Sequence, residues 1–255
     1  MLLTKLIPPQ SHELKNAVSD FNRFIEEPNS DPTERLILTL AGGRACCKST
    51  IASGLVLKGC DETGCSGVCI RKHGKTVRSS VVVQLEWTSN KLSSHYWRNS
   101  LFPCPTFVRY KEGVFDSSVL PIYCFGAEQR VWLSNMTSIS NVKVVWIDEA
   151  NEFESIADLR STINGLPLAD NPVIILTFNP PASRDHWINN QVWGGESRLI
   201  DGINHIMRFH HPSYLDVPRE WLGNKFFEDA EILQRINETA YRHVYLGWPN
   251  GSPSH

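Results

Sequence analysis

Residues 42–50, GGRACCKST, combine glycine, lysine and hydroxyl side chains in the order that a phosphate-binding loop uses. In the pattern GxxxxGK[ST], the lysine reaches the outer phosphates of a nucleotide and the Ser or Thr hydroxyl helps to hold magnesium. We therefore predict that ATP and Mg²⁺ bind at Gly42, Gly43, Arg44, Ala45, Cys46, Cys47, Lys48, Ser49 and Thr50. Taken alone, these residues also fit a glycine turn followed by an exposed lysine.

Two neighbouring acids, Asp148 and Glu149, follow the apolar run 144–147. An aspartate in this position can hold magnesium through water, and an adjacent glutamate can polarise the water that attacks a γ-phosphate. We predict these two roles because ligands of a parallel sheet bind at the carboxyl ends of its strands. A helix cap is the alternative for the acids alone. Their position downstream of a phosphate-type loop favours the catalytic interpretation.

A third polar pair, Thr177 and Asn179, lies in the segment LTFNP. If its strand neighbours the strand of the acids, the hydroxyl and the amide lie beside the γ-phosphate and can sense its presence. A plain Asn-Pro turn is the alternative.

The basic stretch 71–78, RKHGKTVR, has three interpretations. One of its arginines could act on the ATP of a neighbouring subunit, or its cations could contact the phosphate backbone of DNA. A solvated surface loop is the third, since short charge clusters are common in loops.

These residues need a framework of strands that alternate with helices. Apolar runs predict strands at 35–40, 67–72, 107–110, 119–125, 142–150, 172–180 and 205–209. Helical spacing predicts helices within 14–25, from 48 to 59, from 76 to 87, from 155 to 163 and within 221–246. Such alternation implies an α/β fold with a mostly parallel sheet that helices cover on both faces.

Composition limits the class of protein. The chain of 255 residues is long enough for one α/β core, and its formal net charge of −2 provides no global field for nucleic acid. We expect no membrane partner, because no apolar run reaches about 18 residues. The first ten residues do not resemble a signal peptide, and seven cysteines without a framework fit a reducing compartment, so we expect a cytoplasmic protein.

Five segments, in order, resemble the ATPase domain of the large terminase subunit of tailed double-stranded DNA bacteriophages. They are GGRACCKS, VVWIDEANEF, LTFNP, FHHPSYLDVP and AYRHVYLGWP. The resemblance extends from about residue 36 to residue 249, and the last two segments are the most telling. It implies a three-layer P-loop NTPase of the ASCE type, which uses an additional catalytic glutamate. Members of that family drive viral DNA through a portal into a procapsid.

The resemblance also implies roles for individual residues. Lys48 corresponds to the phosphate-binding lysine, and Ser49 and Asp148 correspond to the magnesium positions. Glu149 corresponds to the catalytic acid. Arg44 corresponds to the loop arginine, which could stabilise charge on the γ-phosphate or form only a salt bridge.

Two further features follow from the comparison with the family pattern. Thr177 and Asn179 fall on the motif that couples hydrolysis to movement. The loop departs from the usual GGRGSGKS at Ala45, Cys46 and Cys47. A side chain where φ must be positive costs about 1–2 kcal/mol and can obstruct the phosphate, so we expect ATP binding that is weakened roughly tenfold.

The implied partners are double-stranded DNA, a portal protein with its procapsid, and a small terminase subunit. We expect a pentameric ring on the portal, in the host cytoplasm. The expected division is an N-terminal helix and lead-in at 1–33, the ATPase domain at 34–249 and a tail at 250–255. We expect no nuclease domain in this chain, and a separate nuclease is a further expected partner.

Two other functions remain open at this point. One is an assembly or binding module whose altered loop no longer supports hydrolysis. The other is a different P-loop DNA translocase or a helicase.

Overall fold

A mostly parallel sheet forms the centre of the molecule. The computed structural model describes residues 3–27, 30–93, 95–99, 104–129, 139–192 and 205–250. The strands in these ranges are β1 (Arg35–Ala41), β2 (Ser66–Arg71), β3 (Tyr96–Asn99), β4 (Thr106–Lys111), β5 (Val114–Phe115), β6 (Ile122–Gly126), β7 (Val142–Asp148), β8 (Leu168–Phe178) and β9 (His205–His210). Their order in the sheet is β3-β4-β6-β2-β7-β8-β1-β9, and β5 pairs with β4. Pairing is parallel from β6 through β9 and antiparallel among β3, β4, β5 and β6.

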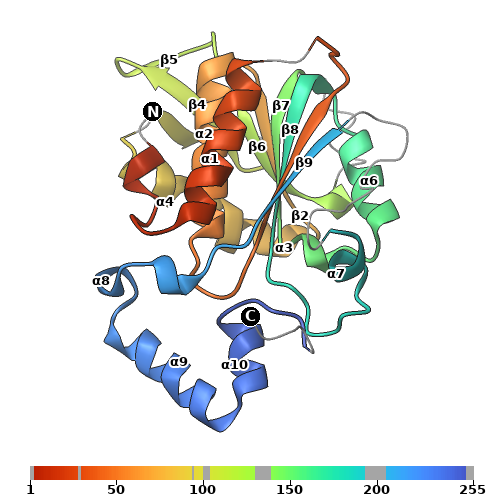
Figure 1. Cartoon of the computed structure of the whole chain (residues 1–255). Coiled ribbons are helices and arrows are strands. Elements are labelled where there is room, and N and C mark those ends of the chain that lie inside the picture. The colour runs from red at the N-terminus through yellow and green to blue at the C-terminus, as the bar shows by residue number, and fades with distance from the viewer. Residues whose placement is uncertain are drawn as a thin grey trace.

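Helices cover both faces of this sheet (Figure 1). Those on one side are α1 (His12–Glu26), α2 (Lys48–Thr63) and α4 (Val83–Lys91), and those on the other are α6 (Ile156–Asn164) and α7 (Trp187–Gln191). On β1, Leu36 and Leu38 belong to the first core, whereas Ile37 belongs to the second. This period of two is the pattern of a strand buried on both faces, and the predicted three layers are confirmed.

Helix α2 is buried because it lies between the sheet and other helices. Two glycines allow this close packing. A Cβ on Gly54 would lie 2.9 Å from the Leu3 side chain, and one on Gly59 would lie 2.6 Å from Val144 and 2.9 Å from Phe21. The described part of the lead-in therefore shares the core with the phosphate loop's helix. The division into 1–33, 34–249 and 250–255 stays a prediction, and residues 251–255 lie outside the described residues.

The helix expected at 76–87 is interrupted. The chain forms α3 (Gly74–Val77), then a π-helical turn at Arg78–Val82, then α4. The hydroxyls of Ser79 and Ser80 both donate to the Thr76 carbonyl, at 3.2 and 2.8 Å. Such bonds compete with the regular backbone ladder of a helix, and three successive valines follow.

Three helices after β9 form a separate group at the carboxyl edge of the sheet (Figure 1). They are α8 (Arg219–Leu222), α9 (Asn224–Ile236) and α10 (Glu238–Val244). Aromatic residues hold them together around Tyr214, whose hydroxyl lies 2.9 Å from that of Tyr241. The helical region predicted at 221–246 is thus confirmed. Every helix in the described ranges is too short or too polar to cross a lipid bilayer.

Candidate nucleotide site

The carboxyl ends of neighbouring parallel strands bring the predicted residues to one edge of the sheet. The phosphate loop follows β1, and Asp148 ends β7. Strand β8 lies between them, so Thr177 and Asn179 lie between the loop and the acids. The two motifs, which are far apart in the chain, therefore share one site. Ligands of parallel α/β sheets bind at this edge.

The loop backbone is left-handed at two positions where family loops carry glycine. The φ angles are 61° at Ala45 and 64° at Cys47. Each costs about 1–2 kcal/mol relative to glycine, so the expected strain is confirmed. Cys47 is also the N-cap of α2, and its side chain makes no capping hydrogen bond. The first amide groups of α2 are therefore left for an anion, which a helix N-terminus favours.

Cys47 adds bulk to the loop but no charge. Burial, together with the neighbouring Cys46, raises the pKa of the Cys47 thiol to about 11, although Lys48 opposes the shift. The thiol is therefore protonated near pH 7 and does not repel a phosphate. Its effect on a nucleotide is steric.

Lys48 is buried and joins the loop to the end of β8. Its Nζ donates to Asn179 Oδ1 at 2.7 Å and to the Gly43 carbonyl at 3.3 Å. The predicted phosphate lysine and the predicted coupling residue Asn179 are thus in direct contact.

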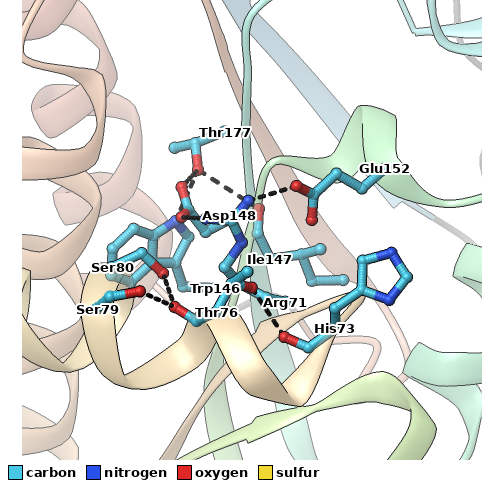
Figure 2. Close-up of polar contacts among 10 residues, drawn as sticks. All are labelled: Arg71, His73, Thr76, Ser79, Ser80, Trp146, Ile147, Asp148, Glu152 and Thr177. Carbon is cyan, nitrogen blue, oxygen red and sulfur yellow. Dashed lines mark hydrogen bonds and ion pairs between the residues drawn. The ribbon is translucent and has the colours of Figure 1, made fainter.

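Thr177 connects to the acid pair instead of the lysine. Trp146 Nε1 donates to Thr177 Oγ1 at 2.8 Å, and this hydroxyl donates to Asp148 Oδ1 at 2.9 Å (Figure 2). All three side chains are buried. The orientation of the Asp148 carboxylate is therefore set by β8. Nothing in the sequence indicated Trp146, because a buried tryptophan is common in any core.

The acids lie in a poorly hydrated environment. Burial raises the pKa of the Asp148 carboxyl, while Arg71, the Thr177 hydrogen bond and Lys48 lower it. Burial also raises the pKa of Glu149, and the charge of Asp148 adds to that shift. A carboxylate whose pKa is raised is a stronger base than an exposed one.

Glu149 has a strained backbone. Its φ of 51° and ψ of 54° are left-handed, and it precedes a 3₁₀ turn at Ala150–Glu152. The Glu152 amide donates to the Glu149 carbonyl at 2.9 Å and closes this turn. Strain of this kind persists only where the surroundings hold it, and it concentrates at functional sites.

The basic stretch 71–78 divides into two parts. Arg71 binds Glu152 and Asp148, and Lys72 binds Asp158, so a solvated surface loop is the wrong interpretation for these two residues. The same internal contacts argue against Arg71 acting on another subunit. Lys75 and Arg78 are exposed, so a contact with DNA and a solvated surface stay open for both, and an action on a neighbouring subunit's ATP stays open for Arg78.

Arg44 is exposed, and its backbone N–H donates to the Val244 carbonyl at 3.1 Å. Its side chain forms no ion pair within the described ranges, and its catalytic role stays a prediction.

The segment that follows α10 packs against the phosphate loop. A Cβ on Gly43 would lie 2.0 Å from the Tyr245 carbonyl oxygen, and one on Gly247 would lie 2.3 Å from the Gly43 nitrogen. The Nε2 of His211 lies 2.8 Å from the Leu246 carbonyl, which ties the same segment to the loop after β9. The segment after the C-terminal helices therefore contacts the phosphate loop directly. The sequence contained the two segments but no sign of this contact.

Comparison with known proteins agrees with this geometry. The family model described as phage terminase large subunit matches residues 34–248. The chain is 27% identical over 229 residues to the large terminase subunit of Bacillus phage SPP1, covering 86% of this chain and 50% of that protein. It thus spans about half the length of the curated relative that it matches.

Solved structures show the same fold. The large terminase from a thermophilic bacteriophage has a TM-score of 0.63 at 15% identity, covering 94% of this chain and 53% of that one. The same terminase in complex with ATP-gamma-S has a TM-score of 0.60 at 14% identity, with the same two coverages. The expected P-loop NTPase fold is thereby confirmed. With a family model that matches most of its length, this chain belongs to the phage terminase large subunit family.

Proposed function

We propose that this chain is the ATP-hydrolysing motor domain of a terminase that translocates double-stranded DNA into a procapsid. One observation carries the proposal. Strand β8 connects the phosphate loop to the acid pair, because Asn179 binds Lys48 at 2.7 Å and Thr177 binds Asp148 at 2.9 Å. The nucleotide-bound structure of the thermophilic bacteriophage terminase, which has this fold, supports ATP as the substrate.

The chain's own residues divide the work of hydrolysis. Lys48 neutralises charge on the outer phosphates, and the loop amides bind them. Glu149 accepts a proton from the attacking water, for which burial has made it a stronger base. Arg44, at the exposed side of the loop, is assigned to the charge that develops on the γ-phosphate.

Ser49 and Asp148 fit a magnesium site by the chemistry of their oxygen atoms. Thr177 occupies Asp148 Oδ1, and Arg71 lies 3.7 Å from Oδ2, so we assign Asp148 to hold the ion through water. The bound ion would neutralise negative charge on the phosphates.

Coupling is assigned to β8. Lys48 donates to Asn179 with the same nitrogen that contacts phosphate in the proposed reaction, so Asn179 and a bound nucleotide share one ammonium group. Thr177, two residues away, holds the carboxylate of Asp148. Binding or loss of phosphate at Lys48 is therefore expected to affect both Asn179 and Thr177, because both residues lie at the end of β8.

The partners that we propose are DNA, a portal protein with its procapsid and a small terminase subunit. We propose a pentameric ring on the portal, in the host cytoplasm. In a ring, some subunits hold the DNA while another hydrolyses ATP, whereas a single domain would release the DNA between successive rounds of hydrolysis.

Calorimetry with ATP and Mg²⁺, followed by a phosphate-release assay, tests the proposal. We expect the chain to bind Mg-ATP and to release phosphate, and the Lys48→Ala variant to do neither. Binding without release would favour the assembly module with an inactive loop. Strand separation of a DNA duplex, in place of packaging, would favour a helicase.

The loop cysteine offers a second test. We expect Cys47→Gly to bind Mg-ATP about tenfold more tightly than the unchanged chain, because it removes the Cβ from a left-handed position beside the phosphate. Stability should change by less than about 1 kcal/mol, since the greater entropy of glycine in the unfolded chain offsets the strain that is relieved.

Cys47→Ala is the matched control, because it keeps the Cβ and adds no hydroxyl that could cap α2. It should bind with the affinity of the unchanged chain. Equal affinity of Cys47→Gly and Cys47→Ala in the calorimeter would show that the Cβ does not obstruct the nucleotide.

A further inference from the structure

Arg71 lies between two acidic groups that come from different parts of the site. It is the last residue of β2, and only 12% of its side chain is exposed. Its Nη2 lies 2.5 Å from Glu152 Oε1, and its Nη1 lies 3.7 Å from Asp148 Oδ2 (Figure 2). Because solvent is largely excluded, these charges are screened much less than those of a surface ion pair.

The two partners of Arg71 flank Glu149. Asp148 immediately precedes it, and Glu152 closes the 3₁₀ turn that follows it, through the 2.9 Å hydrogen bond to the Glu149 carbonyl. The Asp148 side is fixed independently by Thr177. On the Glu152 side, the Oε2 atom has no hydrogen-bond partner in the described part of the chain, which leaves Arg71 as the charged group that holds this carboxylate.

The left-handed backbone of Glu149 requires such support. A non-glycine residue at φ 51° is held there only by its surroundings. An ion pair that anchors both ends of the short segment 148–152 provides it. Lys72, the next residue, binds Asp158 on α6 and lies 5.4 Å from the Phe153 ring centre, so it anchors the chain beyond the turn.

We propose that Arg71 is a positioning residue that holds the turn carrying Glu149 between Asp148 and Glu152. The inference rests on the proposed function in one respect, namely that Glu149 is the base. Arg71 itself does not act on the nucleotide. It keeps the Glu149 carboxylate in the direction that the turn defines.

Hydrogen exchange of the nucleotide-free chain tests the structural part of the proposal. In Arg71→Ala and in Glu152→Ala, the amides of Glu152 and Phe153 should exchange about tenfold faster, because a charged hydrogen bond that restrains the turn is lost. Lys72→Ala is the matched control, since it removes a neighbouring ion pair beyond the turn. Because Lys72 also contacts the Phe153 ring, the comparison uses the Glu152 amide, whose exchange rate should stay unchanged in this variant. Unchanged exchange in both test variants would overturn the proposal.

Turnover tests the functional part. We expect the phosphate-release rate at saturating Mg-ATP to fall about tenfold or more in Arg71→Ala and Glu152→Ala, which is the usual effect of removing a residue that orients a functional group. Nucleotide affinity should stay within about twofold. The double variant should be no slower than the slower single variant, because both changes break the same connection. If the substitutions instead damaged the structure generally, nucleotide affinity would fall as well, or the losses of rate in the two single variants would add in the double variant.

If Arg71→Ala does not fold, Glu152→Ala still removes the carboxylate that Arg71 holds, while Arg71 keeps Asp148 as a charged partner, and normal exchange and turnover in that variant would refute the proposal. If the unchanged chain binds ATP without hydrolysing it, the proposed function fails, and the exchange rates alone then decide whether Arg71 holds the turn.

Discussion

The Glu149→Gln variant is expected to lose turnover by a factor of about 10²–10⁴ while it still binds Mg-ATP. Glutamine has nearly the same shape as glutamate, so the backbone turn and the packing around the site are retained. It does not accept a proton from water, however, and the loss is that of a general base. Phosphate release at saturating ATP measures the first effect, and calorimetry measures the second.

Glu154→Gln is the matched control for this change. Glu154 lies on the same loop, but its side chain is 85% exposed and lies 4.0 Å from Lys72. The identical substitution there should alter neither turnover nor affinity. Normal turnover in Glu149→Gln would refute its role as the base, and a loss of ATP binding in that variant would indicate that the carboxylate has a structural role instead.

The second large effect is expected at Gly247, where the C-terminal segment meets the phosphate loop. The φ of Gly247 is 73°, and an added Cβ would lie 2.3 Å from the Gly43 nitrogen and 2.5 Å from the Gly42 carbonyl carbon. Gly247→Ala therefore carries about 1–2 kcal/mol of backbone strain. Crowding against backbone atoms adds about 1–3 kcal/mol more. Nucleotide affinity should fall as well, because either the loop moves or the C-terminal segment detaches from it.

Gly113→Ala separates the two contributions. Gly113 has a φ of 80°, and an added Cβ there would meet nothing within 4 Å. Gly113→Ala and Gly247→Ala share the backbone strain and the change in unfolded-state entropy. The difference between their free energies of unfolding, measured with urea, therefore reports the contact of Gly247 with the phosphate loop. Equal destabilisation and unaltered Mg-ATP affinity would contradict the contact.

The strained loop and the strained acid show how far sequence reasoning extends into the site. Positive φ at Ala45 and Cys47 was predicted from the glycines that occupy those positions in related loops, and it is confirmed. The left-handed Glu149 was not predicted, because glutamate has no tendency toward that conformation and its neighbours impose it. Strain in a recurring loop is visible in sequence, whereas strain imposed by packing is not.

The interrupted helix around Arg78–Val82 is another feature that the sequence did not predict. Its apolar spacing correctly indicated a helix, but the chain forms a π-helical turn there, beside the Ser79 and Ser80 hydroxyls that donate to the Thr76 carbonyl. Spacing reports which face of a segment is buried. It does not report the hydrogen bonds that compete along the backbone.

The sequence by itself determined the alternation of strands and helices, the loop with Lys48 and Ser49, and the acids at the end of a buried strand, because each depends on local periodicity or on residue type. Only the tertiary structure decided that β8 separates β1 from β7 and thereby places Asn179 against Lys48 and Thr177 against Asp148. It alone joined Arg71 to Glu152, which is 81 positions away in the chain. Contacts of this kind depend on strand order and on the register between strands, and no local pattern of residues encodes either of these.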